Sequence, residues 1–362
     1  MVNYDRLLHT PLCDLLDIRY PIVQAGMFYV AEAGLAAAVS KAGGLGVIGA
    51  AGMTGEELEA EIRKVRQETA NPFGVDIILP AGTPDEVGEG SLPPNFREPP
   101  FLDDLRAELG FRKGEVRPRP LVTTDMVRQQ IAVIFDCKVP VFVSGLGDPR
   151  DLVPRARQQG MKVMAVVGNL KAARRVAQGG VDAVVAQGHE AGGHTGQVGS
   201  LVLTPQVVDA VAPTPVLAAG GIADGRGLLA ALMLGAVGVW VGTRFVATQE
   251  SHAHAVWKER IVAAQPEDTK VTKYFTGKTN RVIRNRLLDM LEGSGLPALP
   301  MPYQNYLVDD VVSIARIKGN GDLMRLTGGQ CAGLITEVKS AGEVIEDMVS
   351  QALGVLAAKL EA

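Results

Sequence analysis

The segment from Gln187 to Gly196 (QGHEAGGHTG) gathers side chains that could do chemistry. It holds two of the five histidines of the chain, His189 and His194, together with one carboxylate and four glycines. Because so many polar groups do not fill an apolar core, the segment indicates a site. Histidine is the side chain that exchanges protons near neutral pH. We therefore predict that His194 is an acid/base residue with a pKa near neutrality, and we interpret His189 as a surface-loop histidine.

The two histidines could instead be metal ligands. No second cluster of histidine and carboxylate joins them, and a glycine-rich backbone does not hold ligands rigidly, so we expect no metal site. The three cysteines, Cys13, Cys137 and Cys331, are far apart and form no CxxC pair. A disulfide framework or a zinc site is therefore not expected, and a reducing compartment fits.

Two further glycine clusters indicate a phosphate site. One is Gly220–Gly225 (GGIADG) and the other is Gly242–Phe245 (GTRF), and each follows an apolar run. Glycine lets backbone N–H groups approach an anion closely, and the N-terminus of a short helix adds its dipole. Each cluster alone could be a tight turn, but the two together predict a bound phosphate.

These clusters require elements to position them. Apolar, strand-like runs alternate with amphipathic helical runs over the first 248 residues, and Thr54 with Glu57 forms a capping box at one helix start. Near-continuous apolar strands are typical of a parallel sheet that is covered on both faces. The expected strands are Pro21–Gly26, Leu45–Ala50, Phe73–Leu79, Val139–Gly147, Lys162–Gly168, Ala183–Gly188, Val216–Ile222 and Gly238–Phe245.

Eight strand–helix units in about 250 residues predict an α/β fold, a (β/α)8 TIM barrel over residues 1–248, with a doubly wound open sheet as the alternative. Residues 80–120 are rich in Pro, Gly and Glu and predict an insertion after the third strand. Residues 249–362 look mostly helical and predict a lid or cap domain. Loops that follow the strands meet on one face of such a barrel, where catalytic residues lie.

Composition excludes several classes of protein. The net charge is −4 at pH 7, so no basic footprint for nucleic acid is present. No apolar run approaches the ~20 residues that span a bilayer, and the N-terminus is no signal peptide. We expect a cytoplasmic protein that binds a small molecule and neither nucleic acid nor membrane.

The chain resembles the nitronate monooxygenase family, formerly called 2-nitropropane dioxygenase, whose relatives include flavin-dependent enoyl-thioester reductases. The motifs that carry this resemblance run in order from residue 20 to residue 250, and they continue weakly through Phe275–Asn285 and Gly328–Ile335. They are PIVQAGM, AGGLGVIG, NPFGVD, QGxEAGGHxG, AAGGIADG and GTRF.

The resemblance implies a flavoprotein that holds FMN without a covalent bond, and His194 matches the active-site histidine of the family. Asp76 stands where the family usually has asparagine, and a carboxylate there would disfavour an anionic reduced flavin. The other implied flavin contacts, at the ring, the ribityl chain and the phosphate, are Ala25, Gly26, Met27, Gln187, Gly192, Gly193, Gly220, Gly221, Gly242 and Thr243.

The expected function is a nitronate monooxygenase, an FMN oxidoreductase that oxidises alkyl nitronates with O2 to a carbonyl compound and nitrite. The alternative is an enoyl-CoA or enoyl-ACP reductase that uses NAD(P)H as reductant of the flavin. Two basic clusters, one within Lys270–Arg286 and one of Arg112, Lys113, Arg117 and Arg119, could meet phosphates in that case, although each could be a solvated surface.

A flavin-binding protein without turnover is the third hypothesis, and the open glycine loops around His194 argue against it. The apolar helical stretch Met348–Leu360 and the resemblance to the family suggest a homodimer.

Overall fold

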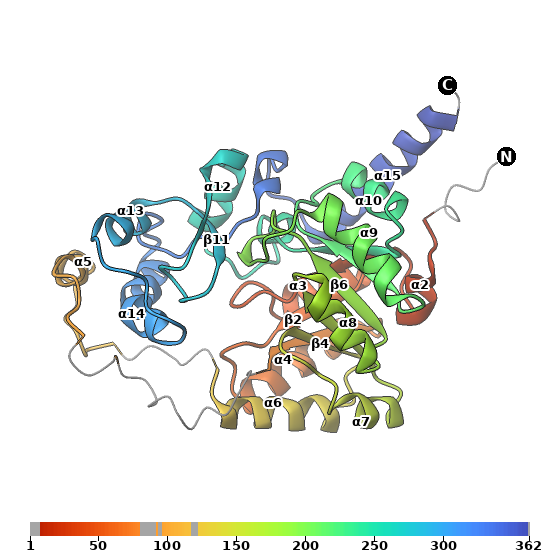
Figure 1. Cartoon of the computed structure of the whole chain (residues 1–362), viewed down its shortest axis with the longest axis horizontal. Helices are drawn as coiled ribbons and strands as arrows, with labels where there is room; N and C mark the ends of the chain where they lie inside the picture. Colours follow the sequence, from red (N-terminus) through yellow and green to blue (C-terminus); the bar gives the residue numbers. More distant parts are fainter. Residues whose placement is uncertain (1–7, 80–91, 93–95, 117–121, 361–362) are drawn as a thin grey trace.

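Eight parallel strands form the centre of the computed structural model, which describes residues 8–79, 92, 96–116 and 122–360 (Figure 1). They pair in the order β1-β9-β8-β6-β5-β4-β3-β2, and a parallel bridge between Val23 and Leu45 joins the two end strands. The sheet therefore closes into the predicted barrel, not a doubly wound sheet. The strands are β1 (Ile22–Gln24), β2 (Gly46–Gly49), β3 (Phe73–Ile78), β4 (Val141–Leu146), β5 (Lys162–Val167), β6 (Ala183–Gln187), β8 (Val216–Ala219) and β9 (Gly238–Val241).

Helices cover the outside of the barrel because the strands bury apolar side chains on both faces. The strands β2, β8 and β9 are buried along their whole length. The predicted capping box is present, since Thr54 and Glu57 exchange hydrogen bonds at the start of α4. The helices of this layer are α3 (Ala33–Lys41), α4 (Gly55–Glu68), α6 (Thr124–Asp136), α7 (Val153–Gln158), α8 (Leu170–Gln178), α9 (Ser200–Val211), α10 (Gly225–Met233) and α11 (Thr243–Val246), and α2 (Pro11–Leu16) precedes β1.

A second body of structure follows β9 and stands beside the barrel mouth (Figure 1). Its own apolar core includes Phe275, Leu288 and Val311. The division at residue 248 into two domains stays a prediction. The elements of this lid are α12 (Ala255–Ala263), η2 (Pro266–Asp268), β10 (Thr269–Thr272), β11 (Asn280–Ile283), α13 (Arg286–Gly293), α14 (Tyr303–Lys318) and η3 (Gln330–Leu334).

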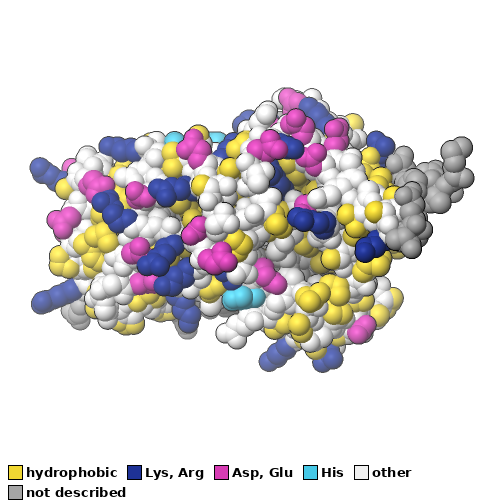
Figure 2. All heavy atoms as spheres, turned by 90° about the horizontal axis from the view of Figure 1, so that it is seen from above, with side chains coloured by type: hydrophobic (Ala, Val, Ile, Leu, Met, Phe, Trp, Pro, Cys, Tyr) yellow, Lys and Arg dark blue, Asp and Glu magenta, His cyan; other side chains and the backbone are white. Residues whose placement is uncertain are grey.

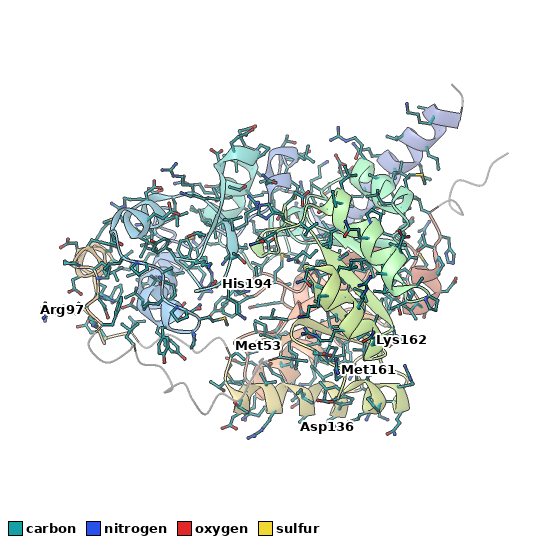
Figure 3. All side chains as sticks on the ribbon, in the orientation of Figure 1. Met53, Arg97, Asp136, Met161, Lys162 and His194 are labelled. Carbon is teal, nitrogen blue, oxygen red and sulfur yellow. The ribbon has the colours of Figure 1, made fainter. Side chains whose placement is uncertain are left out.

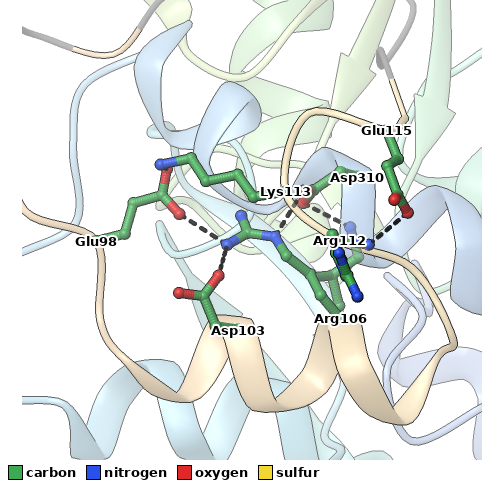
Figure 4. A network of polar contacts seen from close by, with 8 residues as sticks. Glu98, Asp103, Arg106, Arg112, Lys113, Glu115 and Asp310 are labelled. Carbon is green, nitrogen blue, oxygen red and sulfur yellow. Dashed lines mark hydrogen bonds and ion pairs between the residues drawn. The ribbon is translucent and has the colours of Figure 1, made fainter.

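The predicted insertion after the third strand contributes a helix to the lid. Residues 80–91, 93–95 and 117–121 lie outside the described residues, but 96–116 contain α5 (Phe101–Glu108), which packs against α14. Arg106 of α5 is only 3% exposed, and it forms ion pairs with Asp310 of α14, Glu98 and Asp103 (Figure 4). The insertion is thus anchored to the lid rather than to the barrel helices.

The last helix, α15 (Ala341–Leu360), returns from the lid to the barrel and packs against α3 and α10. Ile345, Met348 and Ala352 are buried in the core that it shares with these helices. Packing within the chain therefore accounts for much of the apolar character of this helix, from which the sequence suggested a dimer. The homodimer stays a prediction.

Candidate active site

A cavity of about 240 Å³ lies where the barrel mouth meets the lid. The barrel side consists of residues at the carboxyl ends of the strands, which is where barrel enzymes hold their sites. Those residues include Gly26, Gly49, Asp76 and Gly145. The lid side consists of Trp257, Thr276, Asn280, Met301, Asn305, Arg325 and Thr327.

His194 lies between the two bodies and lines this cavity (Figure 3). It belongs to β7 (Gly193–His194), a short strand that the sequence did not predict. This strand pairs with β11 of the lid, with Asn280 opposite His194. Gln187, at the end of β6, donates from its side-chain amide to the carbonyl oxygen of His194 at 2.6 Å. Barrel and lid together therefore fix the backbone that carries the imidazole.

The hydrogen bonds of the His194 ring define its tautomer. Its Nε2 lies 3.1 Å from the hydroxyl oxygen of Thr276, and that hydroxyl donates to the carbonyl oxygen of Lys278 at 3.1 Å. Because a hydroxyl has a single proton, Nε2–H of His194 is the donor to Thr276. Nδ1 is then the basic nitrogen, and it has no hydrogen-bond partner among the described residues.

The surroundings of His194 keep the imidazole neutral. Burial lowers its pKa to about 4, with further lowering by the positive charges of Arg325 and Lys278. This corrects the expectation of a near-neutral pKa, because the sequence could not place two cations of the lid beside the ring. At pH 7 His194 is a neutral but weak base.

Asp76 lies in the cavity wall between two glycine backbones. A Cβ on Gly26 would come within 2.4 Å of the Asp76 Cβ, and one on Gly145 within 2.5 Å of its Oδ1. That Oδ1 is buried without a hydrogen-bond partner. Burial raises the pKa of Asp76 well above its ordinary value, opposed in part by the backbone amide of Gly145. A protonated Asp76 is uncharged and can donate a hydrogen bond, as an asparagine at this position would.

Glycine backbones also converge beside the cavity, at the ends of β6, β8 and β9. A Cβ on Gly329 would lie 2.9 Å from the amide nitrogen of Gly192 and 3.2 Å from the hydroxyl of Thr243, so only bare backbone fits there. The amides of Gly192, Gly220 and Gly221 donate to no acceptor within the described part of the chain. Unbonded amides of this kind suit a phosphate, so these residues fit the phosphate end of FMN.

Some of the site residues predicted from the sequence line the cavity, and others do not. Those that line the cavity are Gly26, Met27, Asp76, Gln187, Gly192, Gly193 and His194. Those that do not line it are Ala25, Gly220, Gly221, Gly242 and Thr243, and their assignment to the flavin stays a prediction.

The polar cavity residues of the lid were not among the site residues predicted from the sequence. Asn305 is 5% exposed and neither end of its amide has a partner, and the Oδ1 of Asn280 is also buried and unpartnered. These side chains reach the cavity only because the lid folds over the barrel.

The remaining groups of the histidine segment have structural roles. His189 does not line the cavity, and its Nδ1 lies 2.9 Å from the carbonyl oxygen of Gly196. The carboxylate of Glu190 accepts from the amide and hydroxyl of Ser200, the first residue of α9. Among the described residues, no three His, Cys, Asp or Glu side chains are placed to hold a metal ion.

Four residues of the basic clusters form ion pairs. Lys270 pairs with Glu292, Arg284 with Asp289, Arg286 with Glu108 and Lys113 with Glu98. Arg117 and Arg119 lie outside the described residues. Figure 2 shows cationic and anionic side chains interspersed over the visible face, which weakens the interpretation of these clusters as a phosphate surface.

Comparison with known proteins agrees with this geometry. The sequence model of the family described as nitronate monooxygenase matches residues 9–351. A Staphylococcus aureus protein described as a probable nitronate monooxygenase is 34% identical over 351 residues, covering 94% of this chain and 96% of the relative. Within the described residues, no helix is both long and apolar enough to cross a membrane.

Two solved structures are similar over nearly the whole chain. FabK from Thermotoga maritima is 36% identical, with a TM-score of 0.79 and coverage of 98% of each chain. A nitroalkane oxidase from Streptomyces ansochromogenes is 31% identical, with a TM-score of 0.80, and the match covers 96% of this chain and 99% of that one.

Proposed function

Because this chain belongs to the nitronate monooxygenase family, we propose that it is an FMN-dependent oxidoreductase that oxidises alkyl nitronates with O2 to a carbonyl compound and nitrite. Bound FMN supplies the electron transfer, which no side chain of the cavity can perform. The residues that would hold it are those at the strand ends: Gly26, Met27, Gln187 and Gly193 at the ring and ribityl chain, and Gly220, Gly221, Gly242 and Thr243 at the phosphate.

The position of His194 in the cavity wall, where burial lowers its pKa, supports this proposal. A neutral nitroalkane must first lose a proton from carbon, which calls for a base stronger than an imidazole with a pKa of about 4. A nitronate arrives already deprotonated. No proton then has to be taken from carbon, so a neutral His194 suffices beside the substrate, and the anion would raise the pKa of the ring.

The enoyl-thioester reductase is the second candidate, and one observation favours it. FabK, an enoyl-ACP reductase, is 36% identical to this chain and shares its fold over 98% of both chains. In that function NADH or NADPH would be the reductant of the flavin, and His194 would polarise the thioester carbonyl. The ion-paired state of the basic clusters argues for the nitronate function instead.

Anaerobic rapid mixing separates the candidates. The purified protein with its bound flavin is mixed with propyl 2-nitronate, neutral 2-nitropropane, NADH or NADPH, and flavin absorbance is followed. We expect fast bleaching by the nitronate and slow bleaching by the nitroalkane. Fast bleaching by a nicotinamide alone would establish a reductase instead, and bleaching by none of the four would favour a flavin-binding protein without turnover.

A further inference from the structure

The lid side of the cavity holds a cation whose guanidinium has no polar partner among the described residues. Arg325 lines the cavity and is half-buried, and its guanidinium has no hydrogen bond and no ion pair with any described residue, although its central carbon lies 5.9 Å from the ring centre of Phe28. Asp309 and Arg316 act on its charge only from a distance. A guanidinium has five N–H donors, and leaving all of them unpaired in a desolvated position costs free energy. A ligand that accepts hydrogen bonds from these N–H groups would offset this free-energy cost.

A second unpaired donor lies in the same wall. Asn305, on α14, lines the cavity with its side-chain amide buried and unbonded at both ends. Its Nδ2 adds an N–H donor to those of Arg325, and the two residues come from different parts of the lid. No carboxylate among the described residues forms an ion pair or hydrogen bond with either side chain, so the lid side of the cavity offers donors and positive charge.

The position of this pair relative to His194 indicates what it binds. Arg325, Asn305 and His194 line the same cavity, and the charge of Arg325 acts to lower the pKa of His194. Planar guanidinium groups bind two oxygens on one atom in a bidentate manner. A nitro or nitronate group presents two such oxygens.

We propose that Arg325 and Asn305 form an oxyanion-binding subsite that holds the two oxygens of the nitronate group next to His194. This proposal rests on the nitronate function and deepens it, because it makes the substrate class anionic at the reacting end. The lid then selects the substrate and the barrel holds the flavin. The subsite also opposes the accumulation of positive charge on His194 until an anion is present.

The test uses inorganic nitrate, a planar oxyanion that is not turned over, titrated into the flavin-loaded protein while the flavin spectrum is followed. We expect Arg325→Gln to weaken nitrate binding roughly tenfold to a hundredfold and to raise the KM for propyl 2-nitronate more than it lowers kcat. Arg325→Lys keeps the charge without the bidentate geometry, so it should retain part of the affinity.

Lys278→Gln is the matched control. Lys278 also lowers the pKa of His194, but its side chain is exposed and does not line the cavity. A general effect of positive potential would make both variants lose affinity alike, and that outcome would overturn the proposed subsite. We expect Lys278→Gln to change nitrate affinity no more than about twofold.

Further variants and readouts keep the proposal separate from the assigned function. If Arg325→Gln fails to fold, Asn305→Asp places a negative charge in the subsite and should abolish nitrate binding; unchanged affinity would overturn the proposal. If nitronates prove not to be substrates but nitrate binding still depends on Arg325, the function fails and the subsite stands. If nitronates are oxidised and Arg325→Gln changes neither affinity nor KM, the subsite fails and the function stands.

Discussion

At the scale of single residues, the cavity contains polar groups that lack protein partners. Asp76, Asn280 and Asn305 each bury at least one such atom, and Arg325 has no ion pair. Buried polar groups without partners are rare because each costs about 1–3 kcal/mol. Their concentration around one cavity is typical of a site that a polar cofactor and a polar substrate complete.

Replacement of His194 by alanine should reduce turnover without loss of flavin. The side chain offers a neutral acceptor at Nδ1 beside the reacting volume, and removal of an acid/base group lowers a rate by about 10²–10⁴-fold. Steady-state oxidation of propyl 2-nitronate, with flavin content measured in parallel, provides the comparison. A variant that keeps both its flavin and its rate would remove His194 from the mechanism.

The tautomer of His194 should be visible by ¹⁵N NMR. We expect a neutral ring at pH 7 with its proton on Nε2, which stays neutral as the pH falls until about 4. Because the unfolded pKa is near 6.5, the folded state loses stability relative to the unfolded state as the pH falls from about 6.5 towards 4. Thr276→Val should remove the acceptor and give a mixture of tautomers. A ring that titrates near 6.5 in the wild type would contradict the burial described above.

Asp76→Asn should stabilise the protein in a pH-dependent way. The folded pKa of Asp76 is raised, so its contribution to stability is present below the unfolded pKa of about 3.9 and is lost as the pH rises above it. The variant should therefore match the wild type near pH 4 and exceed it by about 1–3 kcal/mol at pH 7.5. Denaturant unfolding of both proteins at the two pH values, with saturating FMN, measures this difference in stability. Equal stability at pH 7.5 would indicate that the carboxylate is well solvated.

At the scale of elements, the helix α5 is held by charge as much as by packing. Arg106 is buried among three carboxylates, of which Asp310 belongs to α14. A buried ion-pair network gives little net stability when formed, but removal of one partner leaves uncompensated charge. Arg106 is therefore one of the charged contacts that hold the insertion after β3 to the lid, together with the ion pair of Glu108 with Arg286.

Arg106→Ala should destabilise the lid strongly. We expect a loss of about 3–5 kcal/mol in unfolding free energy, because Asp310 then stays buried without the counter-charge of Arg106. Faster proteolysis near α5 should accompany this loss. Arg128→Ala is the control, since the ion pair of Arg128 with Asp125 is exposed and should contribute less than about 1 kcal/mol. A similar small effect for both variants would mean that water reaches the network.

At the scale of the whole molecule, barrel and lid share a sheet. The strand β7, which follows β6 of the barrel, pairs with β11 of the lid, and β11 pairs with β10. In addition, the backbone amide of Gln330 in the lid donates to the backbone carbonyl oxygen of Glu190 at 3.0 Å. An opening of the lid as a rigid body would break these bonds and displace His194, so the lid is a fixed wall of the cavity.

Hydrogen exchange should reflect this shared sheet. We expect the amides of Asn280–Ile283 to exchange about as slowly as those of the barrel strands, because opening requires the lid core to separate from the barrel. Native-state exchange followed by mass spectrometry gives the comparison, with the exposed helix start near Leu201 as the fast reference. Rapid exchange of β11 together with a protected barrel would show a lid that opens on its own.

The sequence by itself determined the barrel and the barrel side of the cavity. Apolar runs that alternate with amphipathic ones require covered parallel strands, so the eight strands and the site at their ends could be predicted. His194 was singled out because its segment follows a predicted strand, whereas Gly26 and Gln187 were assigned to the flavin only through the resemblance to the family. The glycine clusters also follow predicted strands, because only glycine permits such close backbone approach.

Only the tertiary structure determined the lid side of the cavity. Thr276, Asn305 and Arg325 are separated by tens of residues, and their proximity results from how the lid packs on the barrel. The strand β7 was not predicted from the sequence either, since its partner lies in β11. The pKa of His194 follows from the same cause: burial and two distant cations set it, and both are properties of the folded chain.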